Sequence, residues 1–202
     1  MSAPTTETGL RERKKAATRQ ALHDASLRLA LEHGPEKVTV EAIADEAGVS
    51  RRTFSNYFAN KEEALFYGDY QRMRLLAGML HARPADEAPW TALTAAAKEF
   101  YDQLGDLDPE WISRRRLIRR HPSLASPQMQ VFAVLEQEIS AEVTLRVGQT
   151  ADPLGVRAKL LTATFLAALR IALNAWLEHP AGTHHWTLAA DLLAQAGRGF
   201  AD

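Results

Sequence analysis

The sequence predicts an all-α protein of about nine helices, and three observations lead to this. Apolar residues recur at spacings of three and four along most of the chain, and no stretch alternates with period two. Gly and Pro stand between these periodic segments, where helices are expected to end and begin. Apolar residues make up 46% of the 202 residues and cysteine is absent, so we expect a packed core without disulfides.

The first helix is expected from about Leu10 to His33, with one face formed by Leu22, Ala25, Leu29 and Ala30. Gly34 is placed to end it in a left-handed conformation, with Pro35 behind. The start of this helix is basic although the net charge of the chain is −1. Against one acid, Glu12, it carries Arg11, Arg13, Lys14, Lys15 and Arg19.

Two short helices should follow. Thr39 is placed to cap the first of them, 40–47, and Gly48 permits a tight turn with positive φ. Ser50 is placed to cap the second, 51–58, in which Phe54 and Phe58 point inward. A long fourth helix opens at Lys61 and runs to about His81.

Two short helices joined by a glycine turn indicate a helix-turn-helix. The outer face of the second helix carries Arg51, Arg52, Thr53, Ser55, Asn56 and Tyr57. Arginine suits guanine edges, threonine can touch a thymine methyl, and the exposed helix N-terminus suits phosphate. An ordinary solvated face is the alternative, but the turn and the basic first helix together favour DNA.

Proline at a first helical position marks most of the later helices. The stretch RPADEAP, 83–89, is the most linker-like part before them. The expected helices run from Pro89 to about Leu104, over 109–120, 127–148 and 153–178, and from a Thr183 cap to about Phe200.

The segment TVEAIADEAGVSRRTFSNYFANKEEAL, 39–65, resembles the N-terminal DNA-binding segment of the TetR family of transcriptional regulators. The matching features are Thr-Val-x-x-Ile-Ala, the Ala-Gly-Val-Ser turn, the Tyr-Phe pair and Lys-Glu-x-x-Leu. TRQALHDASLRLALEHG in the first helix is similar more loosely. The second half resembles the family only in the number and length of its helices.

The resemblance implies specific DNA contacts. Bases would be contacted by Arg51, Arg52, Thr53 and Ser55, and phosphates by Asn56, Tyr57 and Lys61. Thr39 would touch the DNA backbone, and Ser50 belongs to the same predicted set. A mobile arm near the minor groove or phosphates would comprise Arg11, Arg13, Lys14 and Lys15. The Arg51-Arg52 pair replaces the family's commoner small residues, which indicates a G-rich site.

The resemblance also implies two domains, an arm with the helix-turn-helix over 1–60 and a ligand-binding and dimerisation domain over 61–202. Apolar residues cover more of the circumference of the last two helices than one neighbouring helix can bury, which favours a homodimer. The candidates for its interface are Phe165, Leu169, Leu173, Trp176, Leu192 and Phe200. A purely intramolecular core remains the alternative.

Polar residues within this apolar half suggest an effector pocket. Arg170 and Asn174 lie four apart on one helix, and a buried arginine needs an anionic partner. The candidate walls, each of which is more often plain core in proteins, are Trp90, Phe100, Tyr101, Trp111, Met129 and Phe132. The segment RRRLIRR, 114–120, has two interpretations. It is either a solvated face balanced by acids such as Glu136 and Glu138, or a binding surface for a hydrophobic anion such as an acyl-CoA.

Other function classes find little support. The chain has no H-E-x-x-H, G-x-S-x-G, P-loop or dinucleotide glycine pattern, so we expect neither an enzyme nor a cofactor. His184 and His185 are adjacent and do not share a helix face as metal ligands would. The N-terminus has no apolar run, and the apolar stretch 160–177 is interrupted by Arg170 and Asn174. We therefore expect a cytoplasmic protein without a membrane span.

Together these features predict a ligand-responsive transcriptional repressor. It would bind a palindromic DNA operator as a homodimer and be released by a small-molecule effector. An activator of the same build and a helical ligand-binding protein that has lost its operator are the alternatives.

Overall fold

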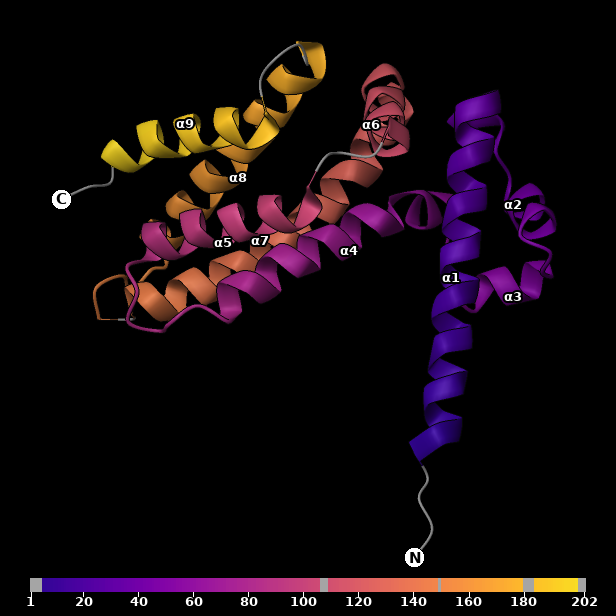
Figure 1. Cartoon of the computed structure of the whole chain (residues 1–202), viewed down its shortest axis with the longest axis horizontal. Helices are drawn as coiled ribbons and strands as arrows, with labels where there is room; N and C mark the ends of the chain where they lie inside the picture. The colour runs from indigo at the N-terminus through magenta and orange to yellow at the C-terminus, as the bar shows by residue number, and fades with distance from the viewer. Residues whose placement is uncertain (1–4, 106–108, 149, 180–183, 200–202) are drawn as a thin grey trace, which may run out of the picture. The chain divides into compact units, whose positions relative to one another are not determined.

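The computed structural model describes residues 5–105, 109–148, 150–179 and 184–199. Within these ranges the chain forms nine α-helices and two short 3₁₀ helices, with no strand (Figure 1). The predicted all-α class is therefore confirmed.

The chain divides into two compact units. The first comprises Met1–Tyr70 and Ser113–Met129, and the second Gln71–Ile112 and Gln130–Asp202. Three helices contribute to both units: α4 (Lys61–His81), α6 (Pro109–Arg120) and α7 (Ala125–Val147). Ion pairs tie the second half of α6 to α4 inside the first unit. The division into functional domains at residue 60 stays a prediction.

The first unit is built on α1 (Thr5–His33), followed by η1 (Pro35–Lys37), α2 (Val40–Glu46) and α3 (Arg51–Ser55) (Figure 1). The predicted inner face of α1 is largely correct. Leu22, Ala25 and Ala30 are buried, whereas Leu29 is half-buried. Gly34 ends the helix with a positive φ of 82°, as a residue without Cβ can.

The third helix is shorter than the predicted 51–58. It ends at Ser55. The residues after it form a turn, in which the backbone N–H groups of Tyr57 and Phe58 both donate to the carbonyl of Phe54. The predicted inward anchors are nevertheless correct. Phe54 and Phe58 are 1% and 3% exposed, with ring centroids 5.8 Å apart.

The second unit contains α5 (Pro89–Leu104), α8 (Val156–Glu178) and α9 (His185–Arg198), together with parts of α4, α6 and α7. Helix α8 packs against α9 and α5 (Figure 1). Leu93, Ile139, Phe165 and Leu193 are fully buried in the shared core. The Trp90 ring packs edge-on against Phe165, and its Nε1 donates to the carbonyl of Leu193 at 3.3 Å.

Two predicted helix starts are displaced. The seventh helix begins at Ala125, directly after η2 (Pro122–Leu124), so Pro127 lies inside its first turn. The eighth begins at Val156 rather than at Pro153, because Asp152 accepts hydrogen bonds from the backbone N–H groups of Val156 and Ala158.

The start of the ninth helix also differs. The predicted Thr183 cap lies outside the described residues. His184 provides the cap, its Nδ1 accepting from Trp186 N at 3.3 Å.

Helix α8 is long and apolar enough, by length and composition, to cross a membrane. Its contacts give this composition another explanation. Leu161, Phe165 and Ala172 are buried against the other helices of the second unit, as expected for the core helix of a soluble protein.

Candidate DNA-binding surface

The helix-turn-helix is fixed by two caps and a tight turn. The side-chain oxygens of Thr39 and Ser50 accept from Ala42 N at 3.1 Å and from Thr53 N at 3.0 Å. Gly48 has φ +67°, and the next residue continues the turn by donating its backbone N–H to Ala44 at 2.9 Å. Both predicted caps and the predicted glycine conformation are confirmed.

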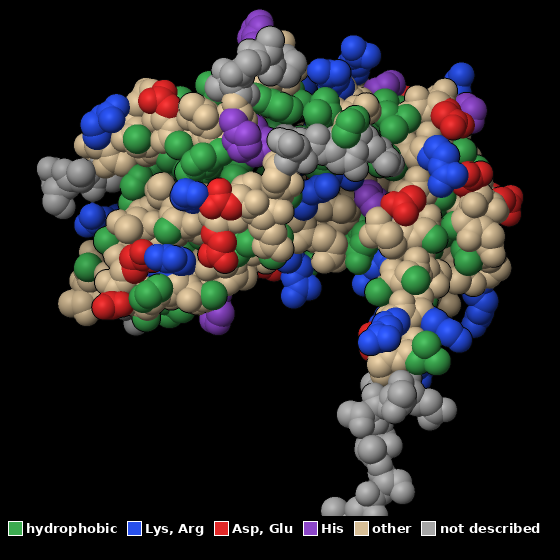
Figure 2. All heavy atoms as spheres, in the orientation of Figure 1, with side chains coloured by type: hydrophobic (Ala, Val, Ile, Leu, Met, Phe, Trp, Pro, Cys, Tyr) green, Lys and Arg blue, Asp and Glu red, His purple; other side chains and the backbone are tan. Residues whose placement is uncertain are grey.

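The outer face of α3 and the turn after it carry the predicted DNA contacts. Arg51, Arg52, Ser55 and Asn56 are exposed, whereas Thr53 and Tyr57 are half-buried. These orientations suit contact with DNA, which itself remains a prediction for each residue. Lys and Arg side chains gather along the lower part of α1 and beside α3 (Figure 2).

Arg51 makes a contact that the sequence did not reveal. Its Nε lies 3.1 Å from a carboxylate oxygen of Glu41 on α2, an ion pair in which both side chains are more than half exposed. Such an exposed pair adds little stability in water. The Nη end of the guanidinium makes no ion pair with Glu41 and remains for a base or phosphate.

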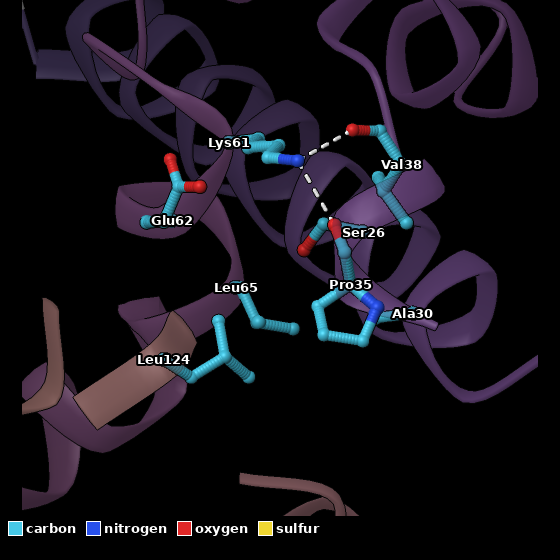
Figure 3. Close-up of a pocket in the computed structure, with 8 residues that line it drawn as sticks. All are labelled: Ser26, Ala30, Pro35, Val38, Lys61, Glu62, Leu65 and Leu124. Carbon is cyan, nitrogen blue, oxygen red and sulfur yellow. Dashed lines mark hydrogen bonds between the residues drawn. The ribbon is translucent and has the colours of Figure 1, made fainter. Parts of the chain in front are cut away.

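Lys61 has a structural task besides its predicted phosphate contact. Its ammonium donates to the carbonyls of Pro35 and Val38 at 2.9 and 2.8 Å (Figure 3). It lines a pocket of about 10 Å³ with Ser26, Leu65, Leu124 and others, which is room for about one water. An ammonium has three donors, so one remains for a phosphate.

The predicted mobile arm belongs to a helix. Arg11, Arg13, Lys14 and Lys15 are exposed, but all lie within α1, which begins at Thr5. The helical spacing places Arg11, Lys15 and Arg19 along one stripe.

A buried polar cluster lies inside the first unit. Asp69 on α4 contacts Arg114 and Arg115 of α6 at 3.1 and 3.2 Å, and all three side chains are less than 10% exposed. His23 on α1 lies 3.3 Å from Arg114 and 2.8 Å from the Ala64 carbonyl. Burial, together with the nearby Arg114 charge, lowers the pKa of His23 although the Ala64 bond opposes the shift.

This cluster corrects the expected role of RRRLIRR. Two of its five arginines are buried against Asp69 and cannot serve an anionic ligand in this conformation, and their partner is neither Glu136 nor Glu138. The exposed arginines of the segment are Arg116, Arg119 and Arg120.

Several candidate pocket walls lie elsewhere than expected. Met129 is 67% exposed and Arg170 is also exposed, so neither lines a buried pocket. Phe100 and Trp111 are buried. The Cζ atom of the Arg72 guanidinium lies over the Trp111 ring, 5.5 Å from its centroid. Half-buried positions are taken by Trp90, Phe132 and Asn174, and Tyr101 is buried.

The dimer candidates divide similarly. Phe165 is completely buried within its own chain and cannot face a partner. Leu169, Leu173, Trp176 and Leu192 are half-buried, and Phe200 lies outside the described residues.

Family models match both halves of the chain. Residues 22–66 match the N-terminal model for bacterial regulatory proteins of the tetR family, and residues 87–201 match the model for the MftR C-terminal domain. The chain belongs to the TetR family of bacterial regulatory proteins. It is therefore a helix-turn-helix transcriptional regulator.

Individual relatives agree with this assignment. The chain is 30% identical over 174 residues to the HTH-type transcriptional regulator TcmR of Streptomyces glaucescens, covering 83% of this chain and 76% of the relative. Proteins matched at this level are regulators rather than enzymes.

Solved structures show the same fold. NalD, the secondary repressor of the MexAB-OprM multidrug efflux pump in Pseudomonas aeruginosa, matches with a TM-score of 0.62 at 22% identity, covering 91% of this chain and 96% of that one. Thermus thermophilus FadR, a TetR-family repressor in complex with lauroyl-CoA, matches with a TM-score of 0.57 at 18% identity, covering 89% and 91%.

Proposed function

We propose that this TetR-family regulator represses transcription in the cytoplasm as a homodimer on a two-fold symmetric operator. Each protomer would place α3 in the major groove, with half-sites about 34–36 Å apart or at a related spacing. The observation that carries this proposal is the capped helix-turn-helix. Its outer face exposes Arg51, Arg52, Ser55 and Asn56, whereas Phe54 and Phe58 pack inside.

An apolar stripe on α8 supports the dimer. Val156, Leu160 and Ile171 are 59%, 54% and 51% exposed. With the exposed Ala163 and the half-buried Ala167 they follow one helix face at spacings of four, three, four and four. A stripe of this length is costly to leave in water, and a second copy of α8 would cover it.

The effector would bind in the second unit and favour a conformation of the dimer that no longer fits the operator. This shift requires only that the effector bind that conformation more tightly than the DNA-binding one. A hydrophobic anion such as an acyl-CoA is the proposed chemical class, supported by the likeness to a TetR-family repressor in complex with lauroyl-CoA. Lauroyl-CoA and free coenzyme A are the probes: release of DNA by the first alone supports an acyl ligand. Release by neither would remove that class.

Fluorescence anisotropy tests the DNA function. Purified protein is titrated onto labelled DNA from upstream of its gene and onto a scrambled duplex, at two salt concentrations. We expect tight, salt-dependent binding that prefers the upstream DNA.

Arg52→Ala should reduce that preference by about 1–3 kcal/mol, whereas Lys98→Ala, in the second unit, should not. Equal binding by wild type and Arg52→Ala would contradict the base-reading role. Transcription in vitro from a promoter carrying the bound site distinguishes a repressor from an activator of the same build.

A further inference from the structure

The guanidinium of Arg19 lies in a cage of aromatic rings. Its Cζ is 5.8 Å from the centroid of Tyr57, 5.9 Å from Phe58 and 5.7 Å from Tyr67. These distances fall within the range of cation–π attraction. The cage joins three segments of the first unit: α1, the turn that follows α3, and the first turns of α4.

No carboxylate of the described residues forms an ion pair with Arg19, so its charge is not neutralised by a neighbour. Nε is buried without a hydrogen-bond partner. The two Nη nitrogens form no hydrogen bond with the described residues, and they are not among the buried atoms that lack a partner. They therefore keep contact with solvent and can donate to an incoming anion.

The position of Arg19 relates this cation to DNA. It is the last member of the α1 stripe that begins with Arg11 and Lys15, and it reaches the ring of Tyr57 just beyond α3. A planar guanidinium can stack on a ring and still present its edge to a phosphate, which an ammonium cannot do as well.

From this geometry we infer that Arg19 is a further DNA-contact and positioning residue. It donates to a backbone phosphate and holds the Tyr57 ring beside the recognition helix. This inference rests on the proposed DNA-binding function. It assigns Arg19 a role in affinity and register rather than in base reading, because phosphate contacts carry no sequence information of their own.

The test compares Arg19→Gln, which removes the charge, with Arg19→Lys, which keeps the charge but loses the planar stack. Lys98→Gln is the matched control, an exposed cation of the second unit paired with Asp102. Anisotropy with the upstream duplex and a scrambled duplex is measured over a series of salt concentrations. Thermal unfolding followed by circular dichroism verifies that each variant is folded.

For Arg19→Gln we expect about a 10-fold loss of affinity on both duplexes. The slope of log affinity against log salt should fall by about 0.9, as for one lost phosphate contact. Arg19→Lys should keep the slope and show an intermediate affinity. Lys98→Gln should change neither quantity.

A double-mutant cycle of Arg19→Lys with Tyr57→Phe tests positioning and remains usable if Arg19→Gln does not fold. If the ring is held by Arg19, the two losses of affinity are coupled. Independent losses would contradict the positioning role.

A folded Arg19→Gln protein that matches Lys98→Gln in slope and affinity would overturn the inference about Arg19. If Arg52→Ala still reduces specificity in the same assay, the proposed DNA-binding function stands. If wild-type protein shows no salt-dependent binding to either duplex, the proposed function fails and this inference fails with it.

Discussion

Asp69 and Arg114 form a buried ion pair, with 3.1 Å between Oδ1 and Nη2 and side chains that are 4% and 3% exposed. The same carboxylate oxygen lies 3.2 Å from Arg115. One acidic side chain of α4 thus holds two arginines of α6. Removing charge from one side of such a cluster is much more costly than breaking a surface pair.

Asp69→Asn is therefore expected to lower the free energy of unfolding by about 3–5 kcal/mol. Asp102→Asn is the matched control, because its pair with Lys98 is more than half exposed and should contribute less than about 1 kcal/mol. Urea denaturation followed by circular dichroism measures both. Equal losses in the two variants would show that burial of the Asp69 cluster does not matter.

Gly68 permits the close approach of α1 and α6 to α4. A Cβ at this position would lie 2.7 Å from His23 Nε2 and 3.0 Å from Arg114 Nη1. We expect Gly68→Ala to destabilise the protein by about 1–3 kcal/mol through overpacking. Gly78→Ala, on the same helix but with open space around it, should instead stabilise by about 0.5–1 kcal/mol. Thermal unfolding of the two variants checks the opposite signs.

His23 should make stability depend on pH. Its Nδ1 faces the Ala64 carbonyl, which only accepts, so the proton is assigned to Nδ1 and Nε2 accepts from Arg114. The other groups around it are Asp24, Asp69 and the Tyr67 ring. Because its folded pKa lies below the unfolded value of 6.5, the unfolded chain binds the proton more readily.

Stability should accordingly fall as pH drops below about 6.5, by at most about 1.4 kcal/mol per pH unit from this one proton. His23→Gln should lack this component and so show a shallower decline. The measurement is the midpoint of urea unfolding between pH 7.5 and 5 for both proteins. Parallel declines would assign the effect to other groups.

The α8 stripe should hold the dimer together. Ile171→Glu places a charge in this stripe and should shift the sedimentation profile at micromolar concentration towards the monomer. Met129→Glu changes a similarly exposed apolar side chain on α7 and should leave the profile unchanged. A monomeric wild type would contradict the dimer itself.

Local sequence signals predicted the helix-turn-helix closely. Thr39 and Ser50 cap their helices because a hydroxyl can satisfy a free N–H within three residues, and Gly48 is needed where φ is positive. The inward positions of Phe54 and Phe58 follow from their spacing. Each of these features depends on neighbours in the chain, so the sequence contains the information.

Long-range partners decided the rest. The sequence shows that Arg114 and Arg170 are cations on apolar helices, but it cannot show that the first is buried against Asp69 and the second exposed. Phe165 and Ile171 are equally apolar on α8, yet the packing of α5 and α9 covers only Phe165 completely. The sequence by itself determined the all-α class, the two caps of the helix-turn-helix and the family; the tertiary structure decided which charges are buried and which apolar face is left uncovered. The physical reason is that burial depends on which distant helix lies opposite, and helical spacing cannot specify this.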